Sequence, residues 1–397
     1  MNGQGPIVWI AGTSWDGVAG TDKRLVQALA RIRPVLWVDP PVRVSLKTAG
    51  RPADLEPVSG SILRLRVAAP PGVTRPGVRV LTALLLDRAI SAALARTGWE
   101  PEAVVVANPL ARFPQKVPGS KVLYLTDDWI AGARLMGLSR AVIRRVLEAN
   151  LAQADGVAAV SAELLAQAGA LRPSASGAVS AVVPNGCPEP APPSSTRRRP
   201  TACLVGQLNE RLDLGLLEAV QASGVGMVMI GPRADRDPAF RRRLDALLAA
   251  GNVRWLGRLE AAELQHQLGV HGVGLTPYAD SSFNRASFPL KTLEYLAAGM
   301  AVVSTDMPSA RWLGTGLITL TSAPQEFALA VREALAGIDR QDQERLRKEF
   351  AAQHTWGARG REFQRLLTAA GNPSGLRTAG TTGTSGRPAT QLSGGPR

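Results

Sequence analysis

The sequence predicts an α/β protein with two doubly wound domains that face each other across a cleft, followed by C-terminal helices. Short apolar runs alternate with stretches of helical spacing in both halves of the 397-residue chain. Such alternation builds parallel sheets with helices on both faces. Between the halves, residues 188–200 are rich in proline, serine and arginine and lack periodicity, which is typical of a linker.

In the first half, the expected strands are short apolar runs, and the expected helices repeat apolar residues every three or four positions. The strands are Ile7–Ala11, Val35–Val38, Ile62–Val67, Val104–Ala107, Val122–Leu125, Gly156–Val160 and Ala181–Val183. The helices are Thr21–Ile32, Val78–Arg96, Leu138–Ala154 and Ala162–Ala168, the last with Ser161 as its N-cap. These elements predict an N-terminal domain over residues 1–187.

The second half repeats the pattern and predicts a C-terminal domain over residues 201–370. Its strands are Ala202–Val205, Gly226–Ile230, Val253–Trp255, Val273–Leu275, Ala301–Ser304 and Leu317–Leu320. Its helices are Asp213–Gln221, Ala239–Ala249, Ala261–Leu268, Leu290–Ala298, Pro324–Leu335, Gln341–Gln353 and Trp356–Ala369. Residues 371–397 hold almost no large apolar side chain, so we expect a disordered tail.

Composition narrows the classes of function. The formal net charge of +14 indicates an anionic partner, such as nucleic acid, anionic lipid or a phosphorylated substrate, or reflects only an arginine-rich composition. The basic residues lack interleaved aromatic residues, which disfavours nucleic acid. Two cysteines and three histidines without metal-ligand spacing argue against a zinc or iron enzyme, so we expect no metal.

The same residues bear on location. The N-terminus lacks the basic region of a signal peptide, and two cysteines give no readable disulfide framework. The longest apolar helical stretch, Val78–Ala95, carries Arg79, Asp87 and Arg88, which argues against a membrane-spanning helix. We therefore expect a cytoplasmic protein that at most lies on a membrane surface.

The most informative stretch is SFPLKTLEYLAAGMAVVS at residues 287–304, which reads as a loop, a helix and a buried strand. Pro289 suits the first helical turn, and the free N–H groups of Leu290 and Lys291 predict an anion site at the positive end of the helix dipole. One turn further on, the Glu294 carboxylate is placed to accept hydrogen bonds from both hydroxyls of a ribose. The alternative is an ordinary surface helix on which Lys291 and Glu294 form an ion pair.

This stretch resembles the donor-site helix of the retaining glycosyltransferases of the GT-B fold (glycosyltransferase family 4, or group 1). These enzymes usually carry two glutamates separated by seven residues, and Glu294 matches the second, which binds the donor ribose. Ala286 stands at the first position. The same departure occurs in a cell-envelope and teichuronic-acid-type branch with the pattern P-x-K-x-x-E-Y-L-A-x-G. The resemblance implies two Rossmann-like domains and a nucleotide diphosphate sugar as donor, with no further cofactor.

Other segments are similar to this family in the same order along the chain. They are residues 37–41 (WVDPP), 124–129 (YLTDDW), 183–186 (VPNG), 202–214 (ACLVGQLNERLDL), 230–232 (IGP) and 252–257 (NVRWLG). In many members the loop after the first C-domain strand carries two cations that neutralise the diphosphate. Here Gly206 opens that loop and Arg211 is its one cation, so the resemblance makes Arg211 a catalytic candidate and Arg285 or Lys291 the second charge.

The N-terminal domain is expected to contribute the acceptor side. Gly17 and Gly20 precede the helix that begins near Thr21, whose end suits a phosphate; Asp16 and Arg24 are placed to line it. A plain strand-to-helix turn is the alternative.

Acidic residues follow two expected strands of this domain. Asp39 follows the second strand, where a dinucleotide fold binds ribose, but the loop AGTSWDGVAG is not GxGxxG and disfavours NAD. Asp127 and Asp128 follow a later strand. Many relatives place a histidine here, and Asp128 is the best substitute for orienting the sugar or the acceptor hydroxyl. Its alternative role is to cap the following helix.

The sequence thus predicts a metal-independent hexosyltransferase-like enzyme that acts on a cell-envelope or exopolysaccharide acceptor, either a glycan or a lipid-linked sugar. An epimerase of the same fold and an inactive sugar- or nucleotide-binding protein remain open. Residues Val78–Arg96 and Leu138–Asn150 combine apolar residues with arginines. Such helices either lie on an anionic membrane or pack on the sheet with their arginines in water.

Overall fold

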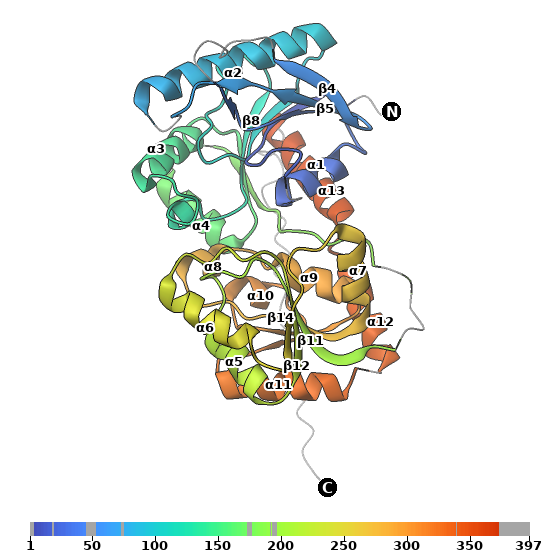
Figure 1. Cartoon of the computed structure of the whole chain (residues 1–397). Helices are drawn as coiled ribbons and strands as arrows, with labels where there is room; N and C mark the ends of the chain where they lie inside the picture. Colours follow the sequence, from blue (N-terminus) through green and yellow to red (C-terminus); the bar gives the residue numbers. More distant parts are fainter. Residues whose placement is uncertain are drawn as a thin grey trace.

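The computed structural model describes residues 4–17, 20–44, 53–72, 75–172, 177–190, 192, 197–338 and 340–372. Two domains lie one above the other, each around its own sheet (Figure 1). The predicted α/β class with two Rossmann-like domains is confirmed. From residue 373 onward the expected tail lies outside the described residues.

The N-terminal domain is built on an eight-stranded sheet in the order β10-β9-β8-β7-β1-β2-β5-β4. Its strands are β1 (Ile7–Ile10), β2 (Val35–Val38), β4 (Asp54–Ser59), β5 (Ile62–Arg66), β7 (Ala103–Val106), β8 (Ser120–Leu125), β9 (Gly156–Ala159) and β10 (Val179–Val182). A separate pair joins β3 (Val42–Arg43) to β6 (Ala68–Ala69). The helical elements are α1 (Thr21–Leu29), α2 (Pro76–Thr97), η1 (Ala131–Ala133), α3 (Arg140–Leu151) and α4 (Ala162–Leu171).

The C-terminal domain has a six-stranded parallel sheet in the order β13-β12-β11-β14-β15-β16. Its strands are β11 (Arg199–Val205), β12 (Gly226–Ile230), β13 (Val253–Trp255), β14 (His271–Thr276), β15 (Ala301–Ser304) and β16 (Ile318–Leu320). Its helices are α5 (Leu214–Ala222), α6 (Pro238–Leu248), α7 (Ala261–Val270), α8 (Ser282–Ala286), α9 (Leu290–Ala297), α10 (Pro308–Trp312), α11 (Pro324–Ala336) and α12 (Gln341–Ala352).

Each sheet has one point at which its strand order reverses. In the C-terminal sheet the chain moves outward from β11 to β13, returns to the other side of β11 as β14 and then proceeds outward again. In the N-terminal sheet the reversal lies between β1 and β7. Connections on opposite faces diverge at such a point and leave a crevice beyond the carboxyl ends of the strands, where ligands bind. The topology therefore offers one crevice in each domain.

Strand β4 was not expected from the sequence. It contains Pro57 and three polar residues, a composition that disfavours a central strand. The structure places it antiparallel to β5 at the edge of the sheet, where the missing N–H of proline is tolerated.

The last helix, α13 (Trp356–Gly371), crosses back to the N-terminal domain. It packs on α1, β8 and β9, and it lies beside α1 in Figure 1. The centroid of the Phe363 ring is 5.3 Å from that of Trp9 and 5.2 Å from that of Tyr124. The expected C-terminal domain at residues 201–370 therefore loses its last helix to the N-terminal domain, because the apolar face of α13 completes that core.

We predict that Phe363→Ala lowers the free energy of unfolding of the N-terminal domain by about 3–5 kcal/mol, because it leaves a cavity beside two buried aromatic rings. Denaturant titration followed by tryptophan fluorescence measures the change. Leu329→Ala is the control, since that side chain is 53% exposed on α11. A loss below about 1 kcal/mol for Phe363→Ala would show that α13 does not complete the N-terminal core.

Candidate active site

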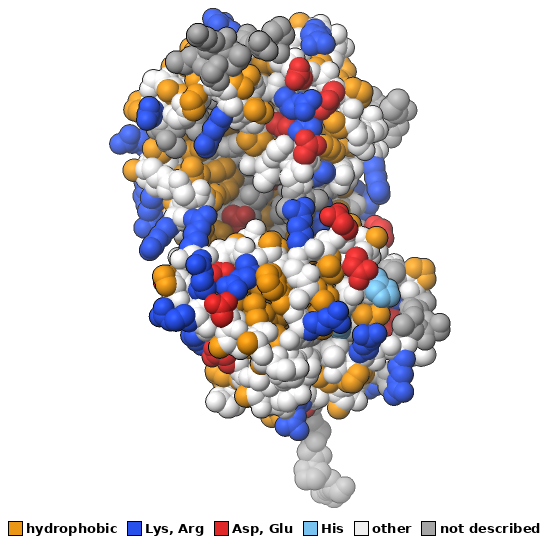
Figure 2. Space-filling view, in the orientation of Figure 1, with side chains coloured by type: hydrophobic (Ala, Val, Ile, Leu, Met, Phe, Trp, Pro, Cys, Tyr) orange, Lys and Arg blue, Asp and Glu red, His pale blue; other side chains and the backbone are white. Residues whose placement is uncertain are grey.

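A cavity of about 240 Å³ lies between the two domains. Its floor includes Val205 and Gly206 at the end of β11 and Pro277 just after β14, so it occupies the reversal point of the C-terminal sheet. Thr21 and Asp127 of the N-terminal domain also line it. The surface is hollowed at this level, with basic side chains above and below the hollow (Figure 2).

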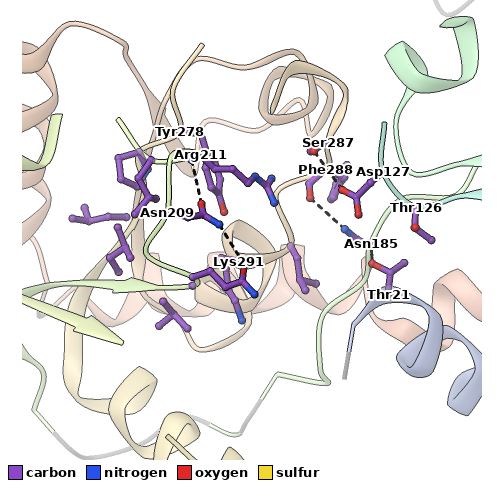
Figure 3. Close-up of a pocket in the computed structure, with 18 residues that line it drawn as sticks. Thr21, Thr126, Asp127, Asn185, Asn209, Arg211, Tyr278, Ser287, Phe288 and Lys291 are labelled. Atoms are coloured by element: carbon purple, nitrogen blue, oxygen red, sulfur yellow. Dashed lines mark hydrogen bonds between the residues drawn. The ribbon is translucent and has the colours of Figure 1, made fainter. Parts of the chain in front are cut away.

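Figure 3 shows the side chains that meet there from the two domains. The N-terminal domain and the hinge contribute Thr21, Thr126, Asp127 and Asn185, and the C-terminal domain contributes Asn209, Arg211, Tyr278, Ser287, Phe288 and Lys291. Ligand pockets usually measure about 300–1,000 Å³. The cavity therefore has room for part of a nucleotide sugar, and the rest of such a ligand would extend into the hollow between the domains.

Gly206 forms the backbone floor of this cavity, as its place after β11 predicts. Gly231 approaches it so closely that an added Cβ would lie 1.9 Å from the Gly206 carbonyl oxygen. Gly231 also has a φ of +141°, which L side chains rarely adopt. The second glycine thus lets two strand ends lie side by side beneath the cavity.

Arg211 lines the cavity, where the sequence placed it. Its Nε donates to Oδ1 of Asn284 at 2.9 Å. The guanidinium also lies 4.8 Å from the ring centroid of Phe283 and 5.4 Å from that of Tyr278. These contacts orient a cation whose described polar contacts leave part of its donor capacity for an anion in the cavity.

Lys291 also lines the cavity and is held by Glu294. The Lys291 Nζ atom is 2.6 Å from Oε2 of Glu294, and Nη1 of Arg24 is 3.0 Å from Oε1 of the same carboxylate. Glu294 is only 4% exposed and does not line the cavity itself. The predicted surface pair is therefore a buried carboxylate between two cations, one from each domain.

One of the two N–H groups of the expected backbone anion site at the start of α9 is already occupied. The N–H of Leu290 donates to the carbonyl of Phe288 at 2.9 Å, so it is not free to bind an anion. Pro289 is the N-cap of α9 and does not occupy its first turn. Leu290 still lines the cavity, next to Lys291.

Arg285 does not reach the cavity. Its guanidinium makes two bonds to the carboxylate of Asp280, at 2.5 and 2.6 Å, and both side chains are exposed. Of the two candidates for the second charge beside Arg211, Arg285 is the one that the structure places elsewhere, because Asp280 in the loop before α8 pairs with it. Lys291 is the second cation at the cavity.

In the loop before α1, some residues line the cavity and others make only structural contacts. Thr21 lines the cavity and donates to Oδ1 of Asn185 at 2.7 Å. Gly20 is the N-cap of α1, while Gly17 closes a turn by donating its N–H to the carbonyl of Ser14. Neither glycine lines the cavity. Asp16 points to Arg64, 2.7 Å away, instead of to an anion.

Asp39 is bound by other residues of its own domain. Its carboxylate accepts from the backbone N–H of Trp15, from Nε1 of Trp37 and from Nε of Arg64 at 2.7–2.9 Å. It is buried and has structural partners on both oxygens. A ribose at this strand end, as in a dinucleotide fold, would have to displace them.

Asp127, and not Asp128, faces the cavity. Asp128 accepts from the N–H of Ala131 at 2.8 Å and so begins the η1 turn, which was the alternative reading. Burial raises the pKa of Asp127, and the nearby charge of Arg211 opposes that rise. Asp127 therefore replaces Asp128 as the candidate for orienting a sugar or a hydroxyl. Successive residues at a strand end point in different directions, so only one of the two can face the cavity.

The sequence did not single out Asn185 as a site residue, although it lies in the VPNG hinge segment. Its side-chain amide donates to the carbonyl of Phe288 at 3.2 Å, while its oxygen accepts from Thr21. Tyr278 and Asn209 were missed as well, since each follows a strand end by an irregular loop. Asn185 therefore bonds to both domains at the wall of the cavity.

No three His, Cys, Asp or Glu side chains within the described ranges come together in a way that could hold a metal ion. Within the same ranges, no helix is both long enough and apolar enough to cross a bilayer.

Part of the chain that lines the cavity is similar to a known protein family. Residues 199–337 match the family described as Glycosyl transferases group 1. The matched segment contains β11, α9 and the cavity residues Gly206, Arg211 and Lys291.

A curated relative and two solved structures agree with this. TuaH of Bacillus subtilis (strain 168), whose name describes a teichuronic acid biosynthesis glycosyltransferase, is 28% identical over 167 residues, which cover 41% of each chain. Sucrose-phosphate synthase from Thermosynechococcus elongatus is 17% identical with a TM-score of 0.68, over 94% of this chain and 100% of that one. The E. coli trehalose-6-phosphate structure bound with UDP-2-fluoro glucose is 13% identical with a TM-score of 0.64, over 91% and 98%.

These findings confirm the resemblance to GT-B glycosyltransferases. The solved structures share the fold over 91–94% of this chain, and the family match and the relative support a glycosyltransferase. The match to TuaH spans less than half the length of that protein.

A second acidic group of the N-terminal domain lies close enough to Asp127 for their charges to interact. Asp22 is buried in α1, and its carboxylate accepts from the N–H of Gly12 at 3.0 Å. Burial, with a smaller contribution from the charge of Asp127, raises the pKa of Asp22 to about 7. The folded protein therefore binds this proton more tightly than the unfolded chain does.

We predict that Asp22→Asn removes part of the pH dependence of stability. The contribution of Asp22 is fully present below its unfolded pKa of about 4 and falls as pH rises through 7, by at most about 1.4 kcal/mol per pH unit. Melting temperatures from pH 5 to 8 should therefore fall less in the variant than in the wild type. Asp54→Asn, at an exposed site, is the control. Parallel curves for wild type and Asp22→Asn would contradict the raised pKa.

Proposed function

We propose that the protein is a glycosyltransferase that moves a sugar from a nucleotide diphosphate sugar to a cell-envelope or exopolysaccharide acceptor, with retention and without a metal ion. The observation that carries the proposal is the meeting of Arg211 and Lys291 at one cavity beyond the carboxyl ends of β11 and β14. The nucleotide sugar is the donor substrate, and no further cofactor is needed.

The two cations suit the charge that develops in such a reaction. As the bond between the anomeric carbon and the diphosphate breaks, negative charge grows on the leaving diphosphate and positive charge on the sugar. Preorganised cations aimed at the leaving group stabilise that state. Arg211 is held by Asn284 and Lys291 by Glu294, so both are positioned before the donor binds.

Asp127 serves the sugar and acceptor side of the cavity. It comes from the N-terminal domain, and its oxygen lies 3.5 Å from Oγ of Ser287 in the opposite domain. There it orients the transferred sugar or accepts a hydrogen bond from the acceptor hydroxyl. A raised pKa suits a group that shares a proton during transfer.

Glu294 binds the donor ribose in this proposal, which requires a change of partner. In the structure both of its oxygens are paired, one with Lys291 and one with Arg24. Ribose hydroxyls would take the place of Arg24, while Lys291 keeps its carboxylate and faces the diphosphate. Such an exchange links donor binding to movement of the two domains, because Arg24 belongs to the N-terminal domain.

The class of acceptor is supported by TuaH, whose name refers to teichuronic acid, a cell-envelope polymer. The N-terminal domain is the acceptor side, since the donor residues belong to the C-terminal domain. A cytoplasmic location is consistent with use of a nucleotide sugar.

Incubation with UDP-, GDP- and dTDP-sugars, with and without a cell-envelope extract, tests the proposal. We expect label to move from one donor class into the extract, with release of the nucleoside diphosphate. Isomerised donor in the absence of extract would indicate an epimerase instead, and tight binding without turnover would indicate a binding protein.

Arg211→Gln should lower the rate of transfer at least about a hundredfold, since removing one donor to a developing charge costs about 10²–10³ in rate. Arg285→Gln is a matched control, because that arginine lies outside the cavity and is paired with Asp280. Equal losses in the two variants would place the diphosphate elsewhere.

Glu294→Gln should weaken nucleoside diphosphate binding about tenfold or more, because it removes a charge-assisted hydrogen bond to the ribose. Inorganic pyrophosphate has no ribose, so its affinity should change little. Calorimetric titration of both ligands makes the comparison within one variant. A similar loss for both ligands would mean that Glu294 acts only by holding Lys291.

A further inference from the structure

A second, larger cavity of about 650 Å³ lies in the N-terminal domain. It opens at the reversal point of that sheet, beside Ile10 at the end of β1 and Asn108 just after β7. The first half of α2 forms another wall, and α2 runs along the side of the domain away from the C-terminal domain (Figure 1). The two cavities share no lining residue.

Four exposed apolar side chains lie on or beside the segments that line this cavity. Val42, Val80, Leu81 and Leu84 are between 41% and 60% exposed, and they lie on or next to the lining segments of β3 and α2. Clustered exposed apolar residues mark contact with a partner or a membrane more often than plain solvent-facing surface. The second helix that the sequence had suggested for this role does not qualify, because α3 buries its apolar residues in the core.

Three arginines line the same cavity: Arg43, Arg79 and Arg112. The side chain of each forms no hydrogen bond or ion pair within the part of the chain that the structure describes. Two acidic residues also line the cavity, and Asp39 is already paired with Arg64. Three arginines against the one remaining carboxylate, that of Asp87, leave the cavity with net positive charge beside an apolar rim.

A buried hydroxyl inside the cavity also lacks a partner. Thr82 lies on α2, is only 5% exposed and lines the cavity, yet its Oγ1 has no hydrogen-bond partner among the described residues. Leaving a buried polar atom without a partner is unfavourable. A ligand oxygen at this position would satisfy it.

We propose that this cavity binds the phosphate headgroup of a membrane lipid while the protein rests on the bilayer through the apolar residues of α2 and β3. The phosphate lies among Arg43, Arg79 and Arg112 and accepts from the Thr82 hydroxyl. The hydrocarbon chains stay in the membrane, beneath the exposed residues Val80 and Leu84. This arrangement satisfies the arginines, the hydroxyl and the apolar rim together, and it stands whether or not the donor chemistry proposed above is correct.

Co-sedimentation of the full chain with vesicles tests the proposal. We expect binding to vesicles of phosphatidylcholine with phosphatidylglycerol, and little binding to phosphatidylcholine alone. The double variant Arg79→Gln/Arg112→Gln should bind about thirtyfold more weakly, since each cation near an anionic surface contributes about fivefold. Leu84→Asp should abolish sedimentation. Leu329→Asp is the matched control, because Leu329 is equally exposed on the C-terminal domain.

The other outcomes overturn the proposal. Equal binding of the wild type and the double arginine variant would assign sedimentation to the overall charge of +14 and not to this cavity. Binding of glycerol phosphate without any sedimentation would assign the cavity to a water-borne phosphate. Donor affinity should be unchanged in every one of these variants, because none of the substituted residues lines the first cavity.

Discussion

The site depends on one buried carboxylate that is held by cations from both domains. Glu294 lies between Lys291 of its own helix and Arg24 of α1, and only 4% of it is exposed. Removing a carboxylate from water is unfavourable unless its charge is compensated, so the pairs constrain both helices. Lys291 is thereby aimed at the cavity, and α1 is drawn toward the C-terminal domain. A ligand that claims Glu294 must compete with Arg24, which couples ligand binding to the arrangement of the domains.

The rest of the architecture follows from two parallel sheets whose carboxyl ends carry the functional residues. The reversal of strand order in each sheet opens one crevice, and each crevice holds a cavity. The cavity between the domains is the smaller one and carries Arg211 and Lys291, which suits a diphosphate. The N-terminal cavity is larger and has an apolar rim, which suits a ligand at a membrane. Helix α13 and Asn185 tie the two halves together, so both cavities belong to one folded unit.

Local patterns in the sequence predicted the buried parallel strands and the residues at the end of β11, because such strands are nearly continuous apolar runs. The pairing of Lys291 with Glu294 also followed from their spacing on one helix. Contacts between distant segments did not follow: Arg24 and Glu294 are far apart in the chain, and the packing of α13 on Trp9 depends on the whole fold. The choice between Asp127 and Asp128 required the direction of each side chain, and Arg285 was misplaced because its partner Asp280 sits in an irregular loop.

A crystal structure of the protein with UDP would test the central claim most directly. The account predicts the diphosphate between Arg211 and Lys291, the ribose hydroxyls on Glu294, and Arg24 withdrawn from that carboxylate. Nucleotide bound in the N-terminal cavity near Asn108, or bound between the domains with Arg24 still paired to Glu294, would contradict it.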